Sequence, residues 1–370
     1  MNLAVKMRSI PVKSLAFVLS SFVVLITPRF STAGTALGDL AASMQPGAWA
    51  ELVTSNIGTA LQAPGSGGVG HILPYADGMK WDPTSRKVYY MGSDDPGDGP
   101  RWVIYSEAAN SWTVVPEQGN WWAGSGVMHQ YNQLDLDPTA GVIYKLTPDG
   151  VKWYKYVISS GTWTQLPNTG VQTYSCCEAL VYYPEMSSVL MLNAGDVRRY
   201  NVTTGQFSWL STPSSYGTSY HSIAEYNPIH KVVIFGGGNA TSQDFYKVNS
   251  AGQITTLRTP PIDLESPRTE LTYDPVTGTY LVFRMGKTFY TYDVLTDTWS
   301  LQPNTNIPAD IWNGEAQNHL HTLATPIATY GVVMFTTCKT GGSCKVYLYK
   351  HAPSTIDITP PAVPRNLRIN

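Results

Sequence analysis

The stretch Tyr292-Asp-Val-Leu-Thr-Asp-Thr-Trp299 places two aromatic residues seven positions apart, around a polar turn. This pattern is typical of a β-hairpin and predicts one strand ending at Tyr292 and a second strand carrying Trp299. The same spacing recurs at Tyr105 to Trp112, Tyr156 to Trp163, Tyr200 to Phe207 and, more weakly, Lys247 to Ile254. A hairpin motif that recurs along the sequence indicates a repeat architecture.

A second motif precedes the hairpins: a strand that runs into a proline. These prolines recur at intervals of 44 to 55 residues, at Pro83, Pro138, Pro184, Pro228, Pro275 and Pro326. Proline fixes a turn after a strand, where its missing N–H costs no ladder hydrogen bond. An apolar strand follows each turn, for example Lys231-Val-Val-Ile-Phe235. Four antiparallel strands at this period predict an all-β fold, the β-propeller with four-stranded blades.

The number of proline motifs predicts six blades. The sixth repeat, which begins at His319, lacks a good outer strand, whereas Gly47-Ala-Trp49-Ala-Glu-Leu52 matches Gly161-Thr-Trp163-Thr-Gln-Leu166 near the other end of the chain. We therefore expect the N-terminal strand to complete the last blade and to leave the ring without exposed edges. A seven-bladed ring is the alternative, if residues 57–75 contain a degenerate repeat.

Three of these motifs resemble kelch repeats, as in the central domain of galactose oxidase: Asp274-Pro275, Phe235-Gly-Gly-Gly238 and the hairpin from Tyr292 to Trp299. The resemblance implies a kelch-like propeller over residues 46–352, and it specifies the fold better than the activity. Galactose oxidase-like enzymes use a copper site with tyrosines and a Tyr–Cys crosslink. The resemblance therefore implies a copper-dependent oxidase as one alternative activity.

The two ends of the chain differ from the repeats. Residues 1–33 predict a secretory signal peptide, with Lys6, Arg8 and Lys13 before an apolar run over residues 15–26 and small residues up to Ala33. That run is too short to cross a bilayer, although an uncleaved anchor is the alternative. Residues 353–370 predict a proline-rich linker whose segment Pro360-Pro361-Ala-Val-Pro364 resembles the approach to a fibronectin type III domain.

Composition narrows the compartment and the partners. Charged residues make up only 14% of the chain and the formal net charge is -2, which argues against nucleic acid or an anionic membrane as the partner. Four cysteines fit an oxidising compartment, so we expect the protein to be secreted, periplasmic or extracellular. We also expect it to be a monomer. Cys338 and Cys344 flank a hairpin tip that a disulfide could close. The adjacent Cys176 and Cys177 either pair with each other or remain thiols.

The loops that lead from one repeat into the next hold the candidate functional residues. Five of the seven histidines lie in them: His71, His129, His221, His319 and His321. Seven positions before the prolines stand Ala76, Tyr131, Cys177, His221, Arg268 and His319. Because equivalent positions of a ring face one another, we expect these residues to converge on a polar funnel with Glu178, Glu270 and His321 nearby.

Such a funnel could support several kinds of chemistry. Histidine or tyrosine can act as a general base and Arg268 can bind a carboxylate, so the candidate catalytic residues are Tyr131, His221, Arg268, Glu270 and His319. His319 and His321 are two apart and could share a metal ion, the one cofactor that the residues suggest. The alternative is that these groups only hydrogen-bond neighbouring blades.

The tryptophans fall into two groups. Trp49, Trp112, Trp163 and Trp299 lie on the repeat and predict core anchors. Trp121, Trp122 and Trp312 lie in loops, where their rings could stack on sugars or could only pack the loops. Together with His129 and Glu178 they are the candidate substrate-binding residues.

Three functions are consistent with these residues. The first is a carbohydrate-directed protein that binds or cleaves a polysaccharide or glycan, for example a lyase in which Arg268 neutralises a uronate carboxylate. The second is a non-catalytic propeller that binds glycans or protein. The third is the copper-dependent oxidase.

Overall fold

The computed structural model describes residues 34–63, 69–93, 100–116, 129–147, 152–167, 178–193, 196–211, 221–239, 243–314 and 319–352. Apart from Gly34, these residues belong to the compact unit Thr35–Asn370. The predicted signal peptide, the predicted linker and four candidate residues (Trp121, Trp122, Cys176 and Cys177) lie outside the described residues. No described helix is long and apolar enough to span a membrane.

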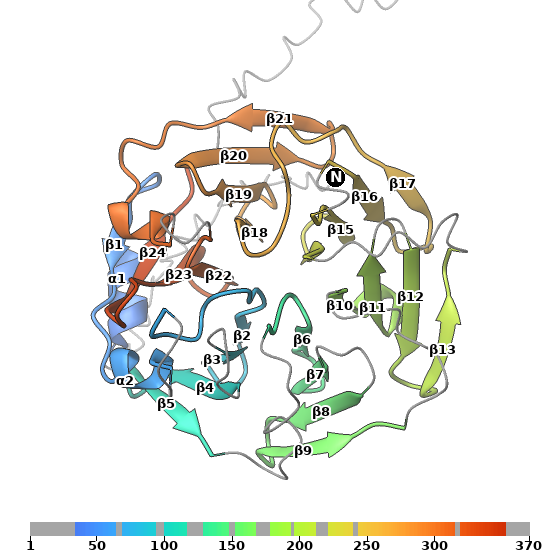
Figure 1. Ribbon diagram of the computed structural model, residues 1–370, viewed down its shortest axis with the longest axis horizontal. Helices are drawn as coiled ribbons and strands as arrows, with labels where there is room; N and C mark the ends of the chain where they lie inside the picture. Colours follow the sequence, from blue (N-terminus) through green and yellow to red (C-terminus); the bar gives the residue numbers. More distant parts are fainter. Residues whose placement is uncertain are drawn as a thin grey trace, which may run out of the picture. The chain divides into compact units, whose positions relative to one another are not determined.

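The described residues form six four-stranded antiparallel sheets arranged as a β-propeller (Figure 1). From the inner to the outer strand, the first three are β2–β5 (Lys80–Asp82, Lys87–Gly92, Arg101–Ser106, Ser111–Val115), β6–β9 (Leu134–Asp137, Val142–Leu146, Trp153–Val157, Thr162–Gln165) and β10–β13 (Ala179–Tyr183, Ser188–Asn193, Asp196–Asn201, Gln206–Trp209). The fourth and fifth are β14–β17 (Ile223–Asn227, Val232–Gly236, Phe245–Val248, Ile254–Thr256) and β18–β21 (Thr269–Tyr273, Tyr280–Arg284, Thr288–Asp293, Thr298–Leu301).

The sixth sheet joins the two ends of the propeller. It runs β22 (Thr322–Ile327), β23 (Val332–Cys338), β24 (Cys344–Tyr349) and then β1 (Trp49–Glu51). In this sheet Trp49 pairs with Tyr349 and Glu51 pairs with Tyr347. The prediction that the N-terminal strand completes the last blade is therefore confirmed.

The inner strands close the ring. In the order β2, β6, β10, β14, β18 and β22, each contacts the next, and β22 contacts β2 again. No seventh blade occurs among the described part of residues 57–75, which instead form helix α2 (Ile57–Leu61) and the bridge between Gln62 and His71. The other described helices are α1 (Ala36–Ser43), η1 (Pro184–Met186) and η2 (Ala309–Trp312).

Five of the proline motifs begin the turns between inner and second strands, whereas Pro326 lies near the end of β22. In three of them an Asp carboxylate accepts backbone N–H groups from the turn: Asp82 from Ser85 at 2.9 Å, Asp137 from Ala140 at 3.0 Å, and Asp274 from Thr277 at 2.9 Å. Asn227 accepts in the same way from Ile229 at 3.1 Å. These bonds satisfy donors that would otherwise lack partners where the strand ends, which explains why Asp or Asn precedes proline.

The hairpin aromatics pack blade against blade. Tyr292 and Trp299 pair in register with ring centroids 4.7 Å apart, and both contact Phe245 of the preceding blade, at 5.1 and 5.4 Å. Trp112 is buried, whereas Trp49, Trp163 and Trp299 are half-buried. The repeat therefore marks the inter-blade core, as predicted.

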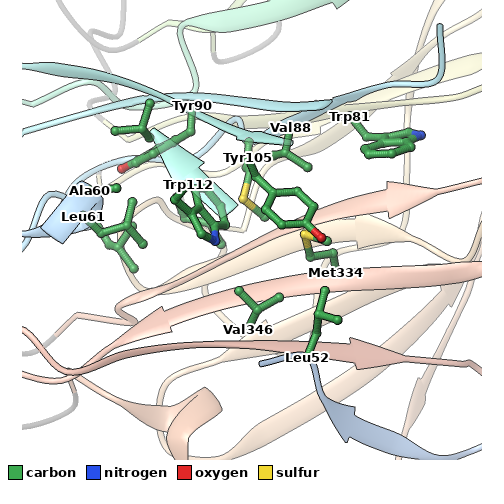
Figure 2. Close-up of a cluster of buried hydrophobic side chains, with 14 of the residues drawn as sticks. Leu52, Ala60, Leu61, Trp81, Val88, Tyr90, Tyr105, Trp112, Met334 and Val346 are labelled. Carbon is green, nitrogen blue, oxygen red and sulfur yellow. The ribbon is translucent and has the colours of Figure 1, made fainter. Parts of the chain in front are cut away.

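The same kind of packing seals the junction where the ring closes. Figure 2 shows Tyr105 and Trp112 of the first blade in one cluster with Met334 and Val346 of the last blade and with Leu61 of α2. At the tip of the last blade Cys338 and Cys344 form the predicted disulfide. Core contacts and a covalent link thus hold the blade that contains both ends of the propeller.

Replacing Trp49 by Ala should destabilise the protein by about 2 kcal/mol, because a half-buried aromatic ring contributes less than a fully buried one. The ring lies 4.5 Å from Tyr349 and 4.9 Å from Phe335. Chemical denaturation measures the effect. Leu301→Ala is the matched control, since Leu301 also lies on an outer strand but is 65% exposed. Equal stabilities of the two variants would contradict the role of β1 in ring closure.

Candidate functional site

Tyr75, His129, Tyr131, His221 and His319 bring their rings together where the inner strands begin, and we call this group the aromatic cluster. Tyr75 stacks on His129 with centroids 3.7 Å apart, and it lies 4.2 Å from His319 and 6.0 Å from His221. Tyr131 lies 5.2 Å from His221. The structure thus brings together three of the residues aligned seven positions before the prolines.

The backbone of the aromatic cluster is strained. Tyr75, Tyr131 and His221 have φ angles of 49°, 39° and 71°, in the left-handed region that costs a residue other than glycine about 1–3 kcal/mol. Hydrogen bonds hold the chain there: Tyr131 N–H donates to Tyr75 O at 2.7 Å, and Ser266 N–H donates to His221 O at 3.0 Å. Strain of this kind gathers at functional sites.

Polar pairs within and beside the cluster can carry protons. The Tyr131 hydroxyl and His129 Nδ1 are 2.7 Å apart. Glu265 Oε2 lies 3.9 Å from His221 Nδ1, and Glu265 Oε1 accepts a hydrogen bond from Arg268 at 2.6 Å. Burial alone would raise the pKa of Glu265, but His221, Arg268 and the charge of Arg284 outweigh burial and lower it. Glu265 is therefore an anion beside an imidazole.

A second histidine pair lies at the edge of this region. His71 Nε2 and His321 Nδ1 are 3.2 Å apart, and both residues are fully buried. Burial lowers the pKa of His71 to about 3, with a contribution from His321, and burial together with His319 lowers the pKa of His321 to about 4. Both rings are therefore neutral near pH 7.

The predicted metal pair, His319 and His321, is not part of a metal-binding group of three side chains among the described residues. The rings of His319 and His321 have centroids 6.0 Å apart. Among the described residues, no three His, Cys, Asp or Glu side chains form a group that could hold a metal ion.

Three other candidate residues lie outside the aromatic cluster. Glu270 is buried in the channel, where its Oε1 accepts the N–H of Ala324 at 2.8 Å. Glu178 forms a buried ion pair with Arg198 of the same sheet. Trp312 packs into a core cluster from η2, 6.1 Å from Phe283. In this structure Glu178 and Trp312 have structural partners instead of a place at the funnel.

Sequence analysis missed two members of the site. Tyr75 was overlooked because the aligned position beside it is Ala76, which carries no functional group. Glu265 lies three residues before Arg268, outside the aligned position. The signal available for Glu265 was an acidic residue close to the aligned Arg268. The signal available for Tyr75 was an aromatic residue next to the aligned Ala76.

The arrangement combines groups capable of acid–base chemistry with partial access to solvent. Except for Tyr131, which is buried, the cluster rings are half-buried and so remain partly accessible. A histidine beside a carboxylate can accept a proton from a substrate while a nearby tyrosine donates one, or the two roles can be exchanged. Arg268 at the edge of the cluster, with its side chain 35% exposed, can contact an anionic ligand.

Comparisons with known proteins find similar structures but no similar family or curated sequence. No protein-family model and no curated protein matches the chain. A protein of unknown function from Bacteroides thetaiotaomicron VPI-5482 is similar, with a TM-score of 0.55 and 14% identity over 81% of this chain and 75% of that chain. Virginiamycin B lyase from Staphylococcus aureus matches with a TM-score of 0.46 and 10% identity over 73% and 83% of the two chains. At 14% identity the similarity to the Bacteroides protein concerns the fold alone.

The buried histidine pair predicts loss of stability in acid. Below the unfolded pKa of about 6.5 the unfolded chain binds protons that the folded histidine pair does not bind. The free energy of unfolding should therefore fall between pH 7 and pH 5, by on the order of 3 kcal/mol for two histidines. Denaturation at several pH values measures this slope. The double variant His71→Asn/His321→Gln should show a flatter slope, whatever its stability at pH 7. An unchanged slope would contradict the assignment.

Proposed function

We propose that the aromatic cluster is a carbohydrate site and that the protein cleaves an acidic polysaccharide or glycan there. The observation that carries the proposal is the convergence of Tyr131 and His221 on one strained, partly accessible spot beside Arg268. This spot combines groups that can move protons with a cation that can hold a carboxylate.

The proposed chemistry assigns one role to each group. The imidazole of His221, oriented by Glu265, removes the proton next to the carboxylate of a uronate unit, and Tyr131 with His129 protonates the leaving oxygen. Arg268 binds the carboxylate and so stabilises the charge that develops when the proton leaves. The stacked rings of Tyr75 and His129 offer an apolar face to a sugar ring. The bond that breaks joins the two sugars, and the product carries an unsaturated end.

A glycan-binding protein without turnover is the second candidate, favoured by the same stacked rings. We also infer that the protein is a kelch-like propeller and is exported. The inference rests on the sequence motifs, and the Cys338–Cys344 disulfide supports an oxidising compartment.

His221→Ala should lower kcat at least 100-fold on an acidic polysaccharide, because general base catalysis contributes about 10²–10⁴-fold. The assay incubates the protein without residues 1–33 with neutral and uronate-containing polysaccharides and follows unsaturated ends by ultraviolet absorbance. His230→Ala is the matched control, since His230 lies in the turn between β14 and β15, at the other end of its strand.

Two further outcomes separate the candidates. Retention of a glycan without products, lost in Tyr75→Ala, would support the binding protein and reject catalysis. Neither binding nor turnover of any polysaccharide, or full activity of His221→Ala, would reject the carbohydrate site.

A further inference from the structure

The end of the channel opposite the aromatic cluster contains a cavity. The inner strands run from the side of the cluster to the proline motifs: Tyr131 precedes β6 and Pro138 follows it. The turns surround a cavity of about 230 Å³ whose rim includes prolines from five of the six motifs: Pro83, Pro138, Pro184, Pro228 and Pro326. We call it the proline-lined cavity.

The repeat gives this cavity layered walls. Two residues before the prolines stand Trp81, Leu136, Tyr182, Tyr226 and Tyr273, and all five line it. These side chains and the proline rings make the wall apolar and largely aromatic. Such a wall packs well against an apolar ligand and, through its ring faces, attracts a cation.

Three charged groups, each standing three residues before its proline, also line the cavity. Lys80 Nζ lies 3.2 Å from Asp135 Oδ1 and 3.5 Å from Glu225 Oε2. The side chains of Lys80, Asp135 and Glu225 are 14%, 10% and 12% exposed, so they are shielded yet reachable. Asp135 Oδ2 also accepts the Tyr182 N–H at 2.6 Å. Two carboxyl groups thus share one ammonium group.

Acidic groups are also in excess deeper in the channel. Asp77 and Glu270 are buried there and interact electrostatically with Lys80 and Glu225. Burial raises the pKa of Glu225 to about 8, with Asp135 and Asp77 adding to the effect and Lys80 opposing it. The described channel therefore holds four carboxyl groups around one lysine, and a cation added beside Glu225 would favour its ionised form.

The surroundings favour an organic cation over a metal ion. No three potential ligand side chains in the described parts of the chain form a metal-binding group, whereas the aromatic and proline walls suit carbon. The volume lies below the range of about 300–1,000 Å³ typical of drug-sized ligands, so the ligand is small.

We propose that the proline-lined cavity binds a small organic amine, whose ammonium group pairs with Glu225 and Asp135 and whose apolar body packs against the tyrosines and prolines. This site is separate from the carbohydrate site and does not depend on it. Because an adjacent ammonium favours the ionised carboxylate, binding near pH 7 releases a proton from Glu225.

Isothermal titration calorimetry with 2-phenylethylamine and butylamine tests the proposal, with 2-phenylethanol and butanol as uncharged controls. We expect the amines to bind at least tenfold more tightly than the alcohols. Titrations in buffers of different ionisation enthalpy should show proton release at pH 7. Alcohols that bind as well as the amines would overturn the proposal.

Two variants locate the site. Glu225→Gln should weaken amine binding at least tenfold and abolish the proton release, while Asp39→Asn, which changes an exposed carboxylate of α1, should not. Ala328→Trp narrows the cavity from an exposed turn and keeps all of its charges, so it tests the location even if Glu225→Gln unfolds. Unchanged amine affinity in Ala328→Trp, or in folded Glu225→Gln, would overturn the proposal.

Discussion

The closed contact of six inner strands around one axis is the constraint on which the rest of the structure depends. Each inner strand is covered by its own blade on one side and by its neighbours in the ring, so its polar groups must find partners across the channel. Asn132 shows how: its Nδ2 donates to Asp77 Oδ2 at 2.9 Å and to the carbonyl of Ala224 at 3.1 Å. A channel built in this way holds charged groups largely shielded from solvent, which costs free energy unless the charges are paired.

The two ends of this channel have different chemistry although the same strands form them. The aromatic cluster lies on loops of unequal length, and its rings are held by strained backbone. The proline-lined cavity is formed by short turns of similar design, so its walls repeat around the axis. Between them Asp77 and Glu270 are buried, and burial raises the pKa of both. The loops bring different side chains to the aromatic cluster, whereas the turns give the proline-lined cavity a wall that repeats from blade to blade.

The sequence predicted the scaffold well because repetition is read directly from spacing. Register alone also predicted that Tyr131, His221 and His319 would meet. The rest depended on loop conformation, which spacing does not encode. Trp312 packs in the core because it lies on η2. Tyr75 joins the aromatic cluster with a left-handed backbone, a conformation that its residue type does not predict. Lys80, Asp135 and Glu225 share one aligned position, so the same alignment could have identified the cavity.

The pairing of β1 with β24 has a consequence for how the chain acquires its fold. Trp49 and Tyr349 are neighbours in one sheet although almost the whole propeller separates them in sequence. Closing so long a loop is entropically costly and slow. During synthesis the first strand must remain without its partner until the last strand has left the ribosome, and the five other blades can form before it pairs. The final step of folding is therefore expected to be the joining of the two ends, and a chain cut short before Cys344 would keep an open edge.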